Sequence, residues 1–393
     1  MPVLSVLLAV VHVLAVIPGA AEDATAGNHQ EKWVQVGGGL FLAVSLQAPG
    51  GPQVAALRVF SHGHWAVDGR LGRAGVRSSL GGLSASPDGR VHAVWVDYAG
   101  PGHVWYAERG PWGWSPGRQL SPGPRYAGFP SVAAGVAGVH VLWYAVRPSE
   151  LTRHGAAYEV VHTWRSQGGW SAPQVVSWGL PDALNPSAAA VAESVHAAWY
   201  QWDQDRYRVQ HARWHRGRWH PSEPISPPDE DASGVSLEGA EDGGLHAVWV
   251  ARTRAGPVVL YRRRSANGRW GPIDRLGPGD HPVVAESQRS VFVAWSHGGR
   301  IRLRVGREGR WGPLVDLGTG EHPALSSTSP VYVAYTRRTP TGWEVVVSMV
   351  SASRDGRWGA GWWLPLAAGV AYLLWRVRRA AVRRAAIHGG EPA

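Results

Sequence analysis

The run YQWDQDRY (200–207) places an aromatic ring, two carboxylates and a guanidinium within a few positions of one another. Carbohydrate recognition uses this combination, because an aromatic face packs under a sugar ring while carboxylate and guanidinium groups bind the hydroxyls. Trp202, Asp203, Asp205 and Arg206 are therefore candidate ligand-binding residues. An ordinary solvated turn of the same composition is the alternative interpretation.

Further candidates carry similar side chains in other turn-rich segments. They are Asp97, Tyr98, Arg153, His154, Tyr126 and Trp178. The two catalytic carboxyl groups of a glycoside hydrolase would need to lie roughly 5 to 9.5 Å apart across a cleft. Asp203 and Asp205 meet the composition, but two aspartates in one turn are common, so no residue is assigned a catalytic role.

Metal binding and cofactor binding are not expected. The acidic run Asp229 to Asp231 offers oxygen ligands for calcium, yet it lacks the spacing of a recognised site, and a solvated acidic turn is the favoured interpretation. The chain has no cysteine, so disulfides, thiolate metal sites and cysteine nucleophiles are excluded.

The positions of these candidates depend on a repeated apolar sequence motif. VHAVWV at 91 returns as VHVLWY at 139, VHAAWY at 195, LHAVWV at 245, VFVAWS at 291 and VYVAYT at 331. A turn that ends in tryptophan also recurs, at Trp65, Trp114, Trp170, Trp219, Trp270, Trp311 and Trp358. The spacing of these tryptophans, 41 to 56 residues, is typical of propeller blades.

Each repeat contains runs of strand length separated by turn residues, as residues 281–318 illustrate, and helical periodicity is missing. The pattern predicts an all-β fold, a seven-bladed β-propeller of four-stranded antiparallel blades over residues 31–358. Six or eight blades are also compatible, because the last unit lacks an outer strand. EKWVQV (31–36) could supply that strand or could form the innermost strand of the first unit.

Histidine recurs at one position of the repeated motif, as His92, His140, His196 and His246. A shared metal would need these rings within about 2 Å of one ion. Equivalent positions of successive blades are spread around a ring, so we expect packed, hydrogen-bonded histidines instead. Phe41, Phe292 and Tyr332 occupy the same position in other repeats.

The two ends of the chain predict its location. Residues 1–21 have an apolar stretch and a small-residue site typical of an export signal, although the missing basic residues leave an uncleaved anchor as the alternative. Residues 359–375 are uncharged and precede an arginine-rich tail, 376–393, which predicts a transmembrane helix with a cytoplasmic tail. A buried last element is the alternative. The propeller is expected on the extracytoplasmic side of the cell membrane.

Charge argues against nucleic acid as a partner. The formal net charge is +10, but part of it lies in the C-terminal tail, and the remaining arginines are scattered among acidic residues. A nucleic-acid binder would gather its basic residues into a stripe with exposed aromatics.

The order P-S-h-A, V-H-h-h-W, h-h-Y-x-R, G-x-W-x-x-P resembles the sialidase-like propellers built from BNR, or Asp-box, repeats. SANGRW (265–270) and SRDGRW (353–358) look like shortened forms of the family signature S-x-D-x-G-x-T-W, and SQGGW (166–170) like a more decayed one. The resemblance implies the propeller fold. The arginine triad, nucleophilic tyrosine and acid of family sialidases have no matching motif here, so none is carried over.

Loops that join the second strand to the third, and each blade to the next, emerge on one face of such a propeller. We expect the binding site there, because these loops vary over a constant scaffold. The sequence favours a recognition module for glycans or envelope components. A sialidase-like glycoside hydrolase and a protein-assembly scaffold at the membrane surface are the alternatives.

Overall fold

The computed structural model describes residues 8–353, except residues 28, 49, 62–63, 149, 151–154, 167 and 180. The fold is that of the compact unit Ala9–Ala352. The predicted membrane span 359–375 and the basic tail 376–393 lie outside the described residues. Within the described part, no helix is long and apolar enough to cross a bilayer.

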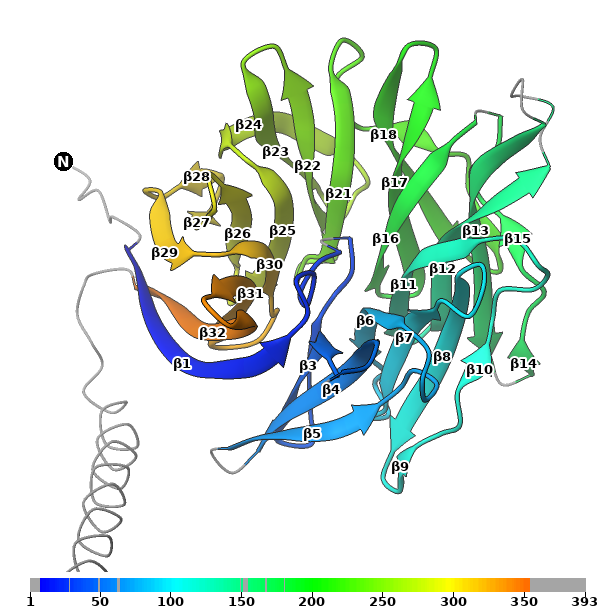
Figure 1. Ribbon diagram of the computed structural model, residues 1–393. Helices are drawn as coiled ribbons and strands as arrows, with labels where there is room; N and C mark the ends of the chain where they lie inside the picture. The colour runs from blue at the N-terminus through cyan, green and yellow to red at the C-terminus, as the bar shows by residue number, and fades with distance from the viewer. Residues whose placement is uncertain are drawn as a thin grey trace, which may run out of the picture. The chain divides into compact units, whose positions relative to one another are not determined.

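All regular structure in the described residues is β-strand, arranged in six antiparallel sheets that we name A to F (Figure 1). Sheet A joins both ends of the chain in the order β30-β31-β32-β1-β3-β4-β5, with β2 paired to β3. Its strands are β1 (Leu8–Ala20), β2 (Trp33–Val36), β3 (Gly39–Gln47), β4 (Gln53–Ser61), β5 (His64–Arg70), β30 (Glu321–Leu325), β31 (Val331–Thr339) and β32 (Gly342–Ser353).

Sheets B to F are local meanders. Sheet B contains β6 (Ser78–Ala85), β7 (Val91–Asp97), β8 (His103–Gly110), β9 (Gly113–Trp114) and β10 (Arg118–Gln119). Sheet C contains β11 (Ala127–Gly135), β12 (Gly138–Pro148), β13 (Ala156–Ser166), β14 (Gly169–Trp170) and β15 (Gln174–Val175). Sheet D contains β16 (Ala183–Val191), β17 (Ser194–Asp203), β18 (Arg206–His215), β19 (Arg218–Trp219) and β20 (Glu223–Pro224). Sheet E contains β21 (Asp231–Gly239), β22 (Leu245–Thr253), β23 (Gly256–Arg264) and β24 (Trp270–Pro278). Sheet F contains β25 (Asp280–Ser287), β26 (Ser290–His297), β27 (Arg300–Arg307), β28 (Arg310–Trp311) and β29 (Val315–Thr319).

The first strands of successive sheets lie side by side, β6 against β11, β11 against β16, β16 against β21, β21 against β25 and β25 against β30. The sheets therefore follow one another around a common axis, as Figure 1 shows. This confirms the all-β, propeller-type prediction. The number of blades stays a prediction, because sheet A unites strands from both ends of the chain.

The repeated motif forms the second strand of each sheet and is buried on both faces. Its large aromatic residue is less than 2% exposed in sheets B to F and on β31 of sheet A. These residues are Trp95, Trp143, Trp199, Trp249, Trp295 and Tyr335. Neighbouring sheets cover both faces of this strand, so alternation of apolar and polar residues would bury polar groups. The nearly continuous apolar run follows from that.

The turn tryptophan of one sheet packs edge-on against an aromatic ring on the third strand of the preceding sheet. The centroid distances are 4.8 Å for Trp170 and Tyr106, 5.1 Å for Trp219 and His162, 5.2 Å for Trp270 and His211, and 4.9 Å for Trp311 and Tyr261. Edge-to-face pairs of this kind are preferred over direct stacking. The tryptophan thus connects neighbouring sheets.

The recurring histidine hydrogen-bonds to the same third-strand ring. Nδ1 of His92 lies 2.8 Å from the Tyr106 hydroxyl, and Nδ1 of His246 lies 2.7 Å from the Tyr261 hydroxyl. In sheet C the partner of His140 is another histidine, His162, at 3.0 Å. These are the packed, hydrogen-bonded histidines that the repeat predicts.

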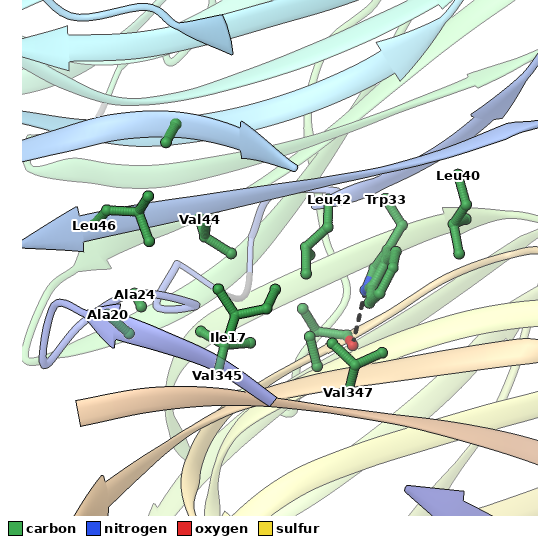
Figure 2. Packing of buried hydrophobic residues seen from close by; sticks show 13 residues of the cluster. Ile17, Ala20, Ala24, Trp33, Leu40, Leu42, Val44, Leu46, Val345 and Val347 are labelled. Carbon is green, nitrogen blue, oxygen red and sulfur yellow. Dashed lines mark hydrogen bonds between the residues drawn. The ribbon is translucent and has the colours of Figure 1, made fainter. Parts of the chain in front are cut away.

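Strand β1 supplies the outer strand beside β32. It also reaches β3, where Ala20 pairs with Leu46. Its Ile17 is 3% exposed and lies in a core with Trp33, Val345 and others (Figure 2). Residues 31–36 include β2, the innermost strand beside β3, which decides between the two interpretations of EKWVQV. Residues 8–20, expected within an export signal, thus have a place in the fold, and the export signal itself stays a prediction.

Replacing Ile17 by alanine tests this place of β1. The change removes a buried side chain, so we expect the free energy of unfolding to fall by about 2 to 5 kcal/mol in urea titrations. Val13→Ala is the matched control, because Val13 lies on the same strand but is 63% exposed. Equal, small effects of both changes would contradict packing of β1.

The buried histidine of the repeated motif, here His92, makes the free energy of unfolding depend on pH. Burial lowers the pKa of His92 from 6.5 to about 4. Between these values the unfolded chain binds a proton that the folded chain does not, so stability falls as pH decreases below about 6.5.

His92→Phe, which copies the phenylalanine of other repeats, should therefore lose less stability than the wild-type chain between pH 7 and pH 4. One pKa unit corresponds to about 1.4 kcal/mol, so we expect a difference of up to about 3 kcal/mol. Unfolding at several pH values measures it. Parallel pH profiles of the two proteins would rule out this role of His92.

Candidate functional site

Aromatic side chains gather on the face where second strands turn into third strands. We call this surface the tyrosine face. It is formed by Tyr98, Tyr126, Phe129, Tyr144, Tyr158, Trp178, Tyr200, Trp202 and Tyr207. They come from sheets B, C and D and from the connections between these sheets, so the ring of sheets brings together residues that are far apart in sequence.

Sheet C carries the centre of the tyrosine face. The Phe129 ring stacks on Tyr144 with centroids 5.3 Å apart, and Tyr158 meets Tyr144 edge-on, also at 5.3 Å. The ring centroids of Tyr126 and Tyr144 are 5.9 Å apart. The Tyr126 ring also lies against Gly102 of the preceding sheet, sheet B. Gly102 allows this approach, because a Cβ there would lie 2.9 Å from the Tyr126 ring.

The next part of the tyrosine face lies on sheet D. Tyr207 is met edge-on by Trp202 at 5.1 Å and by Tyr200 at 5.2 Å. Asp231, from the acidic run, accepts a 2.8 Å hydrogen bond from the Tyr207 backbone N–H. This contact fixes the start of β18, and so the acidic run contributes to the shape of the face.

Three rings of the tyrosine face are open to solvent. Trp178 is 58% exposed, Tyr158 is 39% exposed and Phe129 is 38% exposed. Asp182 accepts a 3.2 Å hydrogen bond from the Tyr158 backbone N–H, which holds the connection that contains Trp178 against sheet C. Flat aromatic surface is therefore available beside fixed polar groups.

Burial raises the pKa of Tyr126 and of Tyr200 to about 12. Burial, together with the neighbouring Tyr126, also raises the pKa of Tyr144 far above its ordinary value. These phenols are neutral at physiological pH. An unperturbed phenol is also neutral at this pH, so the shifts report burial of these rings, and each hydroxyl can both donate and accept a hydrogen bond.

The WDQDR residues lie at the turn between β17 and β18. Arg206 forms an ion pair with Asp205, its Nε lying 2.8 Å from Oδ1, and Arg208 lies 3.6 Å from Asp203. Both carboxylates are thus neutralised by arginines within their own hairpin. This arrangement holds the turn beside Trp202.

The remaining predicted residues have different places. Asp97 is fully buried, accepts the Trp95 indole N–H at 3.1 Å and pairs with Arg73, so its carboxylate faces the sheet instead of solvent. Burial also raises the pKa of Asp97. Tyr98 lies on the tyrosine face under the Arg77 guanidinium, 5.0 Å from its ring centroid. Arg153 and His154 lie outside the described residues.

The axis of the ring is occupied by the chain itself. Residues 29–32, just before β2, contact the first strands of sheets B and C. Lys32 Nζ donates to the Gly81 carbonyl of sheet B, and Gln30 Nε2 donates to the Pro130 carbonyl of sheet C. The Glu31 carbonyl accepts the Leu83 N–H at 2.8 Å. This segment closes the axial opening with polar contacts.

Ionisable groups in the axial segment are strongly shifted. Burial lowers the pKa of Lys32 to about 7, although Asp23 and Glu31 oppose the shift. Burial raises the pKa of Glu238, on β21, to about 7 and that of Glu31 well above its usual range. Repulsion from Glu238 adds to the shift of Glu31. These groups lie within the structure and do not belong to the tyrosine face.

A group of three or more His, Asp or Glu side chains arranged to hold a metal ion is not found in the described part of the chain. Within the acidic run, Glu230 pairs with Arg275.

No protein-family model and no curated protein matches the sequence. Solved structures do match in fold. The polysaccharide lyase Uly1 has a TM-score of 0.56 at 8% identity, over 88% of this chain and 99% of that chain. An ulvan lyase of a new polysaccharide lyase family, bound to a GlcA(1-4)Rha3S saccharide, has a TM-score of 0.56 at 12% identity, over 85% and 94%. The endosialidase of phage phi92 has a TM-score of 0.51 at 9% identity, over 88% and 71%. At such identities the likeness shows the propeller-type fold alone.

Five residues of the tyrosine face were missed as candidates in the sequence: Phe129, Tyr144, Tyr158, Tyr200 and Tyr207. A signal for Tyr144 exists, because it directly follows the tryptophan of VHVLWY, as Tyr200 does in VHAAWY, whereas other repeats have valine, serine or threonine there. Phe129 and Tyr158 stand in segments without such a marker. Their contribution follows from the packing of sheet C.

Proposed function

We propose that the chain is an exported, membrane-held, seven-bladed propeller that binds carbohydrate through its tyrosine face. The observation that carries the proposal is the aromatic surface shared by sheets B, C and D, with exposed rings beside neutral phenols. Carbohydrate binding uses such surfaces, because aromatic faces cover the apolar side of a sugar ring and hydroxyls bind its polar edge.

The fold neighbours support a saccharide ligand. They are named as polysaccharide lyases and an endosialidase, and one of them was solved with a bound saccharide. Turnover of a glycan is the second candidate, favoured by the same names. The paired state of Asp203 and Asp205 favours binding, because neither carboxylate is held as a free acid or nucleophile.

The seventh blade in this proposal consists of β30, β31, β32 and β1, and the first consists of β2 to β5. Because β1 belongs to the core, we propose that residues 8–20 stay with the propeller after export. Intact mass and N-terminal sequencing of the protein isolated from membranes test this. A chain that begins at Glu22 would contradict it.

Glycan binding is tested by substitution of the exposed rings. Full-length protein in detergent is applied to an array of microbial and extracellular glycans, and the affinity of any binder is then measured by calorimetry. Trp178→Ala combined with Tyr158→Ala should lower that affinity at least about tenfold, because stacking surface is lost from the tyrosine face.

Trp112→Ala is the matched control, since Trp112 is 99% exposed on a turn of the opposite face. It should leave the affinity unchanged. An array without any binder, or equal losses in both variants, would refute the proposal. Hydrolysis or elimination products in the same samples would favour the enzyme.

A further inference from the structure

Exposed arginines gather at the sheet B end of the tyrosine face. Two connections flank sheet B there, residues 71–77 between β5 and β6 and residues 120–126 between β10 and β11. The exposed arginines in or beside these connections, which we call the arginine patch, are Arg70, Arg73, Arg77, Arg118 and Arg125. They come from two separate segments, so the fold gathers charges that look scattered along the sequence.

Carboxylates are nearly missing from this end of the face. Residues 69–82, 97–106 and 117–128 form the end of sheet B and its two connections, and Asp97 is the one carboxylate among them. Asp97 is buried, and its Oδ2 accepts the Arg73 Nε–H at 3.2 Å. The other four arginines of the patch form no ion pair with described residues. Their positive charge is therefore not balanced within the described structure.

Arginines on the same face of the other sheets are mostly paired. The pairs are Arg147 with Glu159, Arg206 with Asp205, Arg252 with Asp280 and Arg300 with Asp316. Arg254 and Arg338 lack an ion pair with described residues, but each is a single charge in its own turn. The arginine patch is thus a local excess of positive charge on the ring of sheets.

Aromatic rings hold two guanidinium groups of the patch in place. Cζ of Arg73 lies 5.3 Å from the Trp105 ring centroid, and Cζ of Arg77 lies 5.0 Å from that of Tyr98. Trp105 also stacks on Trp95, with centroids 6.4 Å apart. These rings are therefore already in contact with other side chains, whereas a nucleic-acid binder needs open rings on which bases stack.

The arginine patch continues into the tyrosine face. Arg125 directly precedes Tyr126, and the Arg77 carbonyl accepts the Tyr98 backbone N–H at 2.9 Å. A Cβ at Gly117, next to Arg118, would lie 3.5 Å from the Trp105 ring, so this segment packs on the same indole as Arg73. One chain-like ligand can therefore contact both the unpaired arginines and the rings of the tyrosine face.

We propose that the arginine patch makes the tyrosine face selective for anionic polysaccharides. Carboxylate or sulfate groups of the polymer contact the unpaired guanidinium groups, which bind oxyanions through forked hydrogen bonds. The sugar rings pack on the exposed rings of sheet C. This selectivity rests on the proposed function, because it names the class of saccharide that the same face binds.

Calorimetry of the full-length protein with matched probes tests the selectivity. The probes are dextran sulfate, neutral dextran of the same length, oligogalacturonate and an oligothymidylate. At low salt we expect dextran sulfate or oligogalacturonate to bind at least about tenfold more tightly than neutral dextran. The difference should shrink as salt is added, because salt screens exposed charges. The tighter of the two anionic saccharides identifies sulfate or carboxylate as the preferred group.

Arg77→Gln combined with Arg125→Gln should lower the affinity for that saccharide at least about tenfold, because two guanidinium contacts are lost. Both side chains are exposed, so the fold should persist, which circular dichroism checks. The matched control is Arg216→Gln with Arg218→Gln, which removes the same charge from an exposed turn on the opposite face. It should bind as the wild type does.

Equal losses in the two double variants would overturn the proposal, because they would show an effect of net charge alone. Neutral dextran bound as tightly as both anionic saccharides, or no binding of either one, would also overturn it. Oligothymidylate bound as tightly as the anionic saccharide would overturn it in favour of nucleic acid.

The proposed function fails by a different result. If Trp178→Ala with Tyr158→Ala leaves all glycan binding unchanged, the tyrosine face is not the carbohydrate site, whatever the arginine variants do. If those ring substitutions weaken the binding of a neutral glycan and the arginine variants have no effect, carbohydrate binding stands and selectivity for anionic polysaccharides is refuted.

Discussion

Edge-on packing of a turn tryptophan against a histidine or tyrosine of the preceding sheet is the contact on which the rest of this structure depends. It recurs from Trp170 to Trp311 with centroid distances between 4.8 and 5.2 Å. Successive sheets also contact one another through their first strands and their apolar second strands, and the tryptophan adds a contact farther from the axis, at the third strand. The tryptophan contact holds each sheet in the same orientation relative to the preceding one. The turns that join second to third strands therefore all lie on the same face of the ring.

A ring of sheets also needs an end that meets its beginning. Strand β1 provides this, because it lies beside β32 and reaches β3, and its Ile17 and Ala20 enter the core that both ends of the chain share. Residues 21–32 then cross the axis before β2 begins. Closure of the ring and closure of the axial opening are therefore carried out by one continuous N-terminal segment.

The repeated motif was sufficient to predict the strands, their burial and the propeller-type fold, because a strand that is buried on both faces has a nearly continuous apolar sequence. Ring closure was not predictable, since an apolar stretch before Pro18 also suits an export signal, and the partner of β1 lies at the other end of the chain. The candidate turn at 200–207 was found from its composition. Tyr144, Tyr158 and Phe129 were not, because only the packing of sheet C brings these three rings together.

The pairing of β1 with β3 offers the most direct measurement of this account. The chain has no cysteine, so Ala20→Cys with Leu46→Cys introduces one defined pair at positions that face each other across two strands. Such Cα separations permit a disulfide. We predict that mild oxidation of the folded protein forms it, seen by mass and by a gel shift, whereas Ala20→Cys with Val67→Cys does not react. Absence of the engineered disulfide between positions 20 and 46 in folded protein, or loss of residue 20 from the mature chain, would contradict closure of the ring by β1.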